Sequence, residues 1–204
     1  IDLPLVVSLF LACFAIVFGT RHTDATEHQD GLILAISMES VVKLIAMASV
    51  GFYVIFFMFD GPGDLWQRAS ESVPVMQALT YETPLARWIL LIVLSAFAIV
   101  MLPRQFHVTV VENRTMGELR TAGILFPLYL IAINLFVLPV AIGGVLTFNG
   151  QGDADLYVLT LPFALDQPLL TLIAFIGGFS AATAMVIVAS VALSIMISND
   201  IVMP

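Results

Sequence analysis

The stretch LLTLIAFIGGFSAATAMVIVASVALSIMI, residues 169–197, contains no charged residue and decides the fold class. A helix needs about 20 consecutive apolar residues to cross a bilayer, because the hydrocarbon core is about 30 Å thick and each residue advances the helix by about 1.5 Å. Strands of a membrane β-barrel would be about 10 residues long and would alternate apolar with polar residues. This long, continuous stretch therefore predicts a membrane-spanning helix.

Four further apolar runs share the pattern, at residues 3–18, 32–59, 85–102 and 121–148. Together the five runs predict an all-α, polytopic bundle of integral membrane helices in which residues 1–204 belong to one larger domain. The first run is shorter than a full span, and the sequence starts without Met inside an apolar run. We therefore expect the chain to be a piece of a longer membrane protein.

The composition excludes several classes of protein. Hydrophobic residues make up 60% of the 204 residues and charged residues 11%, whereas soluble domains carry about 25% charged residues. The sequence is therefore incompatible with a soluble enzyme or a disordered segment. A net charge of -8 argues against a nucleic-acid partner. The single cysteine, Cys13, can form neither an intrachain disulfide nor a cysteine-based metal site.

Catalytic motifs are not found in this segment. It has no Walker loop, no Gly-x-Ser-x-Gly and no kinase sequence. His22 and His28 are six residues apart, whereas two ligands on one helix prefer a spacing of four. We therefore expect no catalytic residue and no metal ligand here.

The connecting segments predict the orientation of the bundle. Five spans place residues 19–31 and 103–120 on one side, and residues 60–84 and 149–168 on the other. The first side carries four arginines: Arg21, Arg104, Arg114 and Arg120. The second side has Arg68, with Arg87 just inside the next span. Because basic residues are retained in the cytoplasm, the first side is predicted to be cytoplasmic.

Two charged residues, Glu39 and Lys43, lie inside the second predicted span. Residues four apart share one face of a helix. A lone charge at the centre of a membrane helix costs roughly 2.5–3.5 kcal/mol on insertion scales, so these two need a partner or a water-filled cavity. Two interpretations remain open: the charges neutralise one another between helices, or they form a gate or coupling element in a transport path.

The fifth predicted span carries hydroxyl groups among small residues. Ser180 and Thr183, three residues apart, can direct two oxygens at one point. One interpretation is close helix packing with hydrogen bonds between helices. The other is a Na⁺ site completed by backbone carbonyls of an interrupted neighbouring helix.

Two prolines, Pro127 and Pro139, lie inside the fourth predicted span. Each removes a helix hydrogen bond and bends the axis. The bend is either an ordinary feature of a membrane bundle or a hinge for gating.

Residues 103–113 are polar and aromatic in close alternation, and they include Arg104, Gln105 and His107. This pattern favours a short cytoplasmic helix or an ordered loop that packs against the bundle. His107 is the residue type that titrates near pH 7.

Several segments together resemble one family. They are GTRHTDATE at 19–27, ESVVK at 39–43, LPRQFHVTVVEN at 102–113, LFPLY at 125–129, and the fifth span from SAAT at 180–183 to SND at 198–200. They resemble the sensor histidine kinases whose N-terminal half is a domain similar to sodium:solute symporters. The resemblance covers essentially the whole chain.

The resemblance implies a fragment of a leucine-transporter-type inverted-repeat fold, in which the five spans are middle helices of a larger domain. It implies Na⁺ as the coupling ion at Ser180 and Thr183, and a coupling or gating role for Arg104, Gln105 and His107. The symporter loop has a Gln-Pro-His core, whereas this chain has Phe106 in place of the proline.

The resemblance also implies partners and a location. The partners would be the lipid bilayer, a small organic solute such as an amino acid or a short carboxylate, a cytoplasmic kinase domain of the same chain, and a response regulator. The location would be the bacterial inner membrane, and protein phosphotransfer would belong to the parent protein. A stand-alone sodium:solute symporter, an inert membrane anchor and H⁺ coupling remain as alternatives.

Overall fold

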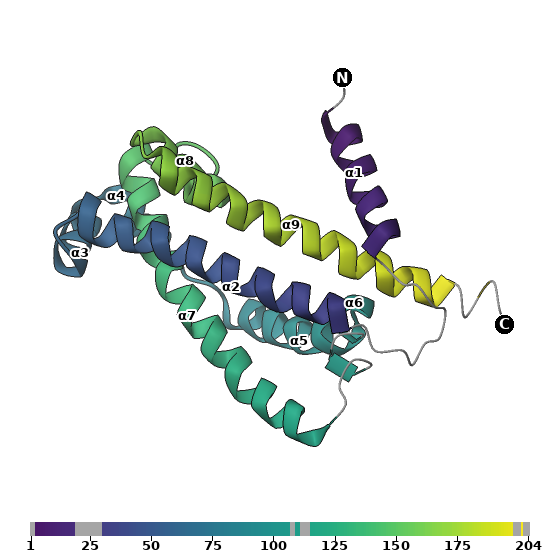
Figure 1. The fold of residues 1–204 in the computed structure, drawn as a ribbon. Coiled ribbons are helices and arrows are strands. Elements are labelled where there is room, and N and C mark those ends of the chain that lie inside the picture. The colour runs from purple at the N-terminus through teal and green to yellow at the C-terminus, as the bar shows by residue number, and fades with distance from the viewer. Residues whose placement is uncertain (1–2, 19–29, 107–108, 111–114, 198–200, 202–204) are drawn as a thin grey trace. The chain divides into compact units, whose positions relative to one another are not determined.

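A computed structural model describes residues 3–18, 30–106, 109–110, 115–197 and 201. This part of the chain is helical and contains no strand (Figure 1), which confirms the predicted all-α class. The main elements are α1 (Leu3–Phe18), α2 (Asp30–Tyr53), the π-helix η1 (Val54–Met58), α3 (Pro62–Glu71), α4 (Val73–Leu79), α5 (Leu85–Met101), α6 (Pro103–Phe106), α7 (Met116–Phe148), the 3₁₀ helix η3 (Ala154–Leu156), α8 (Tyr157–Ala164) and α9 (Pro168–Ile197).

Each of the five predicted spans is helical. Three contain stretches long and apolar enough to cross a membrane: Ile33–Met58, Met116–Phe148 and Pro168–Ser194. These three helices mark the chain as a membrane protein. The helix α1 has 16 residues and α5 has 17, so membrane crossing by these two shorter helices stays a prediction.

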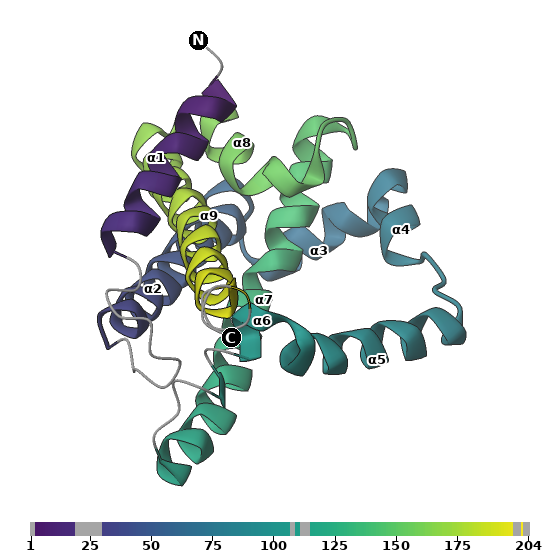
Figure 2. The same ribbon diagram turned by 90° about the vertical axis from the view of Figure 1, so that its right-hand side faces the viewer.

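The connections on the predicted outer side are more helical than expected. Residues 60–84 were expected to be a loop, yet they form α3 and α4, and residues 149–168 contain η3 and α8. Proline explains two of these starts, because Pro62 begins α3 and a second proline follows the start of α4. A proline in the first turn loses no hydrogen bond and already has a helical φ angle. The two short helices α3 and α4 lie next to one another, joined at Ser72 (Figure 2).

The helix α7 starts five residues earlier than the apolar run predicted. The hydroxyl of Thr115 accepts a hydrogen bond from the Glu118 amide at 3.3 Å, and the Glu118 carboxylate accepts one from the Thr115 amide at 3.4 Å. This reciprocal capping box satisfies two amides that a helix start would leave without partners. Polar residues therefore extend α7 beyond the apolar segment.

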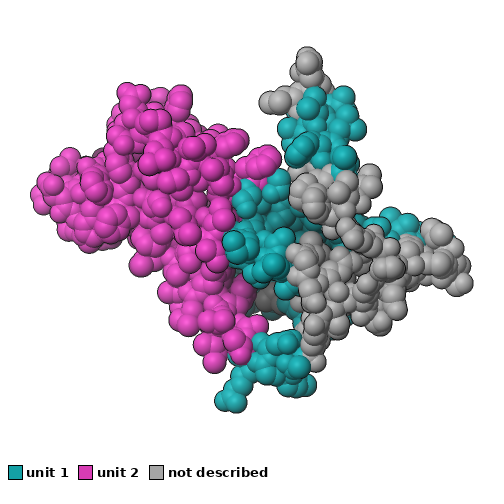
Figure 3. All heavy atoms as spheres, in the orientation of Figure 1, with its two compact units in different colours: residues 1–40, 84–120, 180–204 teal, residues 41–83, 121–179 magenta. Residues whose placement is uncertain are grey.

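The chain forms two compact units (Figure 3). The first unit comprises residues 1–40, 84–120 and 180–204, and the second comprises residues 41–83 and 121–179. In the first unit, Ile187, Val188 and Val191 of α9 form a small buried cluster with Ile36 of α2 packed against it.

The second unit holds the larger buried core. The residues that form it come from η1, the short helices α3, α4 and α8 and the ends of the long helices, and they include Val50, Val54, Leu65, Val75, Val140, Leu161 and Ala174. Two helix contacts in this unit require glycine. A Cβ atom at Gly144 would overlap the ring of Tyr157, and one at Gly177 would overlap the Cβ atom of Ala46. The backbones therefore approach closely at both points, as is common for helices that pack in lipid.

Candidate functional site

Glu39 is the one buried charged side chain among the residues that the structure describes, with 7% of its surface exposed. It lies in α2, inside the stretch Ile33–Met58 that is long enough to cross a membrane. Charged groups in such segments are rare and are functional-site candidates by default, because desolvation of the charge is costly. Glu39 thus lies in a helix that is long and apolar enough to cross a membrane, and its role stays a prediction.

Lys43 lies on the same helix, four residues after Glu39, and its side chain is half-buried. The boundary between the two compact units passes between these residues. Continuous helical geometry places them one turn apart. Both interpretations of the two charges therefore remain compatible with the structure.

The end of the same helix is a π-helix, η1, which no sequence pattern predicts. Val54 at its start is completely buried, and the amide of Gly61 donates to the carbonyl of Ile55 at 2.9 Å. A π-helix is less favourable than an α-helix and is frequently found at functional sites. The residues of η1 are all apolar, so no residue type could have signalled the change of helix form.

Ser180 and Thr183 both lie in α9 within the first unit, and both are half-buried. The Thr183 hydroxyl donates to the backbone carbonyl of Ser180 at 2.9 Å. This bond uses the hydroxyl hydrogen, and the oxygen keeps lone pairs that can accept a hydrogen bond or coordinate a cation. The bond joins the Thr183 hydroxyl to the backbone of Ser180, and a site made of the two hydroxyls stays a prediction.

The segment after α5 is partly helical. Arg104 and Gln105 lie in α6, and the carbonyl of Gln105 accepts a hydrogen bond from the Thr109 hydroxyl at 2.7 Å. Of the two forms expected, a short helix or an ordered loop, residues 103–106 adopt the helix, and its cytoplasmic position stays a prediction. His107, like the pair His22 and His28, lies outside the described residues.

Both predicted hinge residues lie inside α7, which runs through Pro127 and Pro139 as one helix of 33 residues. Between them, the Asn134 side chain donates to the carbonyl of Leu130 at 2.7 Å. The hinge role stays a prediction. Within the described parts of the chain, no three His, Cys, Asp or Glu side chains gather at one point that could hold a metal ion.

An ion pair lies on the short helix α3, outside the candidate membrane spans. The Nε atom of Arg68 lies 3.0 Å from the Asp64 carboxylate, and the same guanidinium lies 5.4 Å from the centre of the Phe59 ring. The hydrogen bond from Arg68 holds the pKa of Asp64 below its ordinary value of 3.8. This arrangement supports α3 locally and offers no reactive group.

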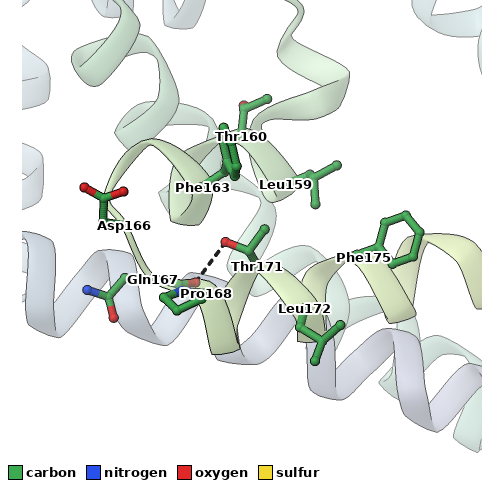
Figure 4. Close-up of a pocket in the computed structure, with 9 residues that line it drawn as sticks. All are labelled: Leu159, Thr160, Phe163, Asp166, Gln167, Pro168, Thr171, Leu172 and Phe175. Carbon is green, nitrogen blue, oxygen red and sulfur yellow. Dashed lines mark hydrogen bonds between the residues drawn. The ribbon is translucent and has the colours of Figure 1, made fainter.

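A pocket of about 880 Å³ lies between α8 and the first turns of α9, entirely within the second unit (Figure 4). Its walls are mostly apolar, with four polar side chains at the turn and the adjoining helix ends. The lining residues are Leu159, Thr160, Phe163, Asp166, Gln167, Pro168, Thr171, Leu172 and Phe175. Sequence reasoning missed this pocket because it placed a loop where α8 is found.

The chain was compared with known protein families, known proteins and solved structures. The chain matched no protein-family model, no curated protein and no solved structure. The findings therefore define a class, an all-helical membrane protein, and the function is inferred from the residues themselves.

Proposed function

We propose that the chain is the membrane module of a symporter-like sensor histidine kinase, which binds or carries a small organic solute and reports its presence to a cytoplasmic kinase. The solute class is an amino acid or a short carboxylate. Na⁺ is the coupling ion, held at Ser180 and Thr183, and the module lies in a bacterial inner membrane as part of a leucine-transporter-type inverted-repeat fold. The output passes to a kinase domain of the same chain and a response regulator.

The buried carboxylate of Glu39 is the observation that carries the proposal. An inert anchor needs only apolar helices, and a buried charge in one of them would be a cost without a benefit. Transporters, by contrast, place ionisable groups inside membrane helices along the path of the solute or ion. The change of the α2 helix to π form at η1 supports a functional role for this helix, because π-helices are frequently found at functional sites.

The test uses the whole protein, with its kinase domain, in proteoliposomes that carry a Na⁺ gradient. Uptake of radiolabelled amino acids and short carboxylates is measured beside autophosphorylation of the kinase. The variant Glu39→Gln removes the charge and keeps the shape. We expect both solute uptake and the kinase response to fall roughly tenfold or more, which corresponds to about 1.4 kcal/mol of lost interaction.

A matched control is Glu82→Gln, because Glu82 is exposed and lies outside the described helices. This variant should behave as the wild type. Uptake without any change in kinase activity would overturn the signalling role and would favour a stand-alone symporter. If the wild type binds and carries neither an amino acid nor a short carboxylate, the proposal as a whole is overturned.

A further inference from the structure

The pocket between α8 and α9 presents mostly hydrogen-bond acceptors. The Thr160 hydroxyl donates to the carbonyl of Leu156 at 3.0 Å, and the Thr171 hydroxyl donates to the carbonyl of Gln167 at 2.8 Å. Each hydroxyl hydrogen is thus used within its own helix end, while the oxygen lone pairs stay able to accept. The Asp166 carboxylate, when ionised, only accepts.

The fourth polar side chain, Gln167, can both donate and accept. Its amide nitrogen donates one hydrogen to the carbonyl of Leu165 at 3.4 Å, while the second amide hydrogen and the side-chain oxygen remain for a ligand. Three of the four polar side chains therefore present only acceptors, which suits a group that has several donors and no acceptor. An organic ammonium ion has this property.

The charge of the pocket has the matching sign. Asp166 is the one charged residue among the lining residues, and residues 121–204 contain no Lys, Arg or His. The basic residues of the second unit, Lys43 and Arg68, are not among the residues that line the pocket. No basic side chain lines the pocket, so its carboxylate complements a cationic ligand.

The turn that carries Asp166 is held by the backbone. The Asp166 amide donates to the carbonyl of Phe163 at 3.2 Å, and the Gln167 amide donates to the carbonyl of Pro162 at 2.9 Å. Asp166 itself has a φ angle of 51°, a left-handed conformation that Asp tolerates better than most residues. The carboxylate is thus attached to a turn of defined geometry between two helices (Figure 4).

Aromatic and aliphatic side chains form the rest of the wall. Leu159 and Phe163 come from α8, and Leu172 and Phe175 come from α9 (Figure 4). Such a surface favours an apolar body on the ligand, and an aromatic face also attracts a cation. A volume of about 880 Å³ lies within the range of pockets that bind small organic molecules.

We propose that this pocket binds a small organic ammonium ion with an apolar body, in which the ammonium group meets Asp166 and the body lies against Phe163 and Phe175. The site is separate from the residues that carry the proposed function. If the pocket does not bind an ammonium ion, the predictions for Glu39 still stand. If the Glu39 variants behave as the wild type, the prediction for the pocket still stands.

The test measures binding of 2-phenylethylammonium to the whole protein in phosphatidylcholine nanodiscs, by equilibrium dialysis. The neutral analogue 2-phenylethanol and the anionic analogue 3-phenylpropionate are compared with it. We expect the ammonium ion to bind at least about tenfold more tightly than either analogue, because a hydrogen bond to a charged partner is stronger than a neutral one.

The variant Asp166→Asn keeps the size of the side chain and removes its charge. We expect it to weaken binding of the ammonium ion about tenfold and to leave binding of 2-phenylethanol unchanged. The control Asp155→Asn changes an exposed carboxylate of the same connection that does not line the pocket, and it should bind as the wild type. A second variant, Phe163→Ala, changes an exposed side chain and should weaken binding of the amine and the alcohol alike.

Three results would overturn the proposal. The first is equal affinity for the amine and the alcohol, which would mean that the pocket is only apolar. The second is the same loss in Asp155→Asn as in Asp166→Asn. The third is binding of phosphatidylethanolamine, added to the nanodiscs, without any binding of the free amine, which would make the occupant a lipid.

Discussion

Gly177 of α9 and Ala46 of α2 meet so closely that a Cβ atom at Gly177 would overlap the Cβ atom of Ala46. The neighbouring Gly178 is exposed, and a Cβ atom there would meet no other atom within 4 Å. Two adjacent glycines of one helix therefore differ in whether a larger side chain could replace them. Gly177 sets the distance between α2 and α9, whereas Gly178 does not.

This difference predicts opposite outcomes for the same substitution. Gly177→Ala should lower the free energy of unfolding by about 1–3 kcal/mol, the usual cost of overpacking, whereas Gly178→Ala should leave it unchanged or raise it slightly because alanine favours the helix. The measurement is SDS-induced unfolding of the whole protein in mixed micelles. Equal stability of the two variants would show that the contact with Ala46 is absent.

The predicted orientation can be tested with single cysteines in a Cys13→Ala background. Gln151→Cys should react with a membrane-impermeant maleimide added to intact cells, since the connection between α7 and α9 is predicted to lie outside. Gln151 is preferable to Gly150, because Gly150 has a φ angle of 72° and any side chain there would be strained. Asn113→Cys, at a position outside the described residues, should react only after the cells are permeabilised. The opposite pattern would reverse the orientation.

The two charges of α2 can be removed together. In the double variant Glu39→Leu with Lys43→Leu, we expect normal expression and loss of solute uptake, because no lone charge remains in the membrane while the functional carboxylate is gone. Glu39→Leu alone should also lower the yield of folded protein, since it leaves one charge without its counterpart. The control replaces the exposed Met38 and Val41 by leucine. Full uptake in the double variant would mean that the charges only neutralise each other.

The ion pair on α3 predicts a pH dependence. Because the Arg68 hydrogen bond lowers the pKa of Asp64, its stabilising effect is present above the pKa of the unfolded chain and is lost as the pH falls through the lower pKa of the folded state. The variant Arg68→Gln should raise the pKa of Asp64 towards 3.8. NMR titration of the Asp64 carboxyl carbon in the wild type and the variant measures this. An unchanged pKa would show that Arg68 is not the cause.

The hydroxyls of α9 predict a change in the sodium requirement. Ser180→Ala and Thr183→Ala should each raise the Na⁺ concentration for half-maximal uptake about tenfold, the effect of losing about 1.4 kcal/mol of binding. Their cost in stability should be smaller, about 0.6 kcal/mol for a hydrogen bond between membrane helices. The exposed Ser194→Ala serves as the control. Uptake by the wild type that ignores Na⁺ and stops with a proton uncoupler would assign the coupling to H⁺.

The long helices could be predicted from the sequence because lipid imposes one simple rule. An apolar run of sufficient length has to be helical, since the backbone finds no other hydrogen-bond partner in lipid. The predicted runs at 3–18 and 169–197 therefore match α1 and α9 to within one residue. The start of α7 was missed because it depends on Thr115 and Glu118, which are polar and lie outside the apolar pattern.

The pocket and the short helices between the long ones could not be predicted for a different reason. The segment that forms α8 has only eight residues, too few for a membrane span, and its proline at position 162 argues against a helix. Its helical form depends on packing, because Leu161 and Tyr157 are buried in the core of the second unit. Asp166 then becomes part of a pocket wall only after α8 has folded against its neighbours. Of the candidate site, the position of Glu39 in a membrane helix could be predicted, whereas its burial required the structure.

The absence of basic residues from position 121 onward also has a consequence for how the protein is made. The connection between α7 and α9 holds Asp153, Asp155 and Asp166 and nothing that would retain it in the cytoplasm. The predicted orientation therefore implies that the insertion machinery passes this connection across the bilayer, while Arg120 retains the start of α7 in the cytoplasm. On that prediction, the two longest apolar helices enter the membrane as one hairpin.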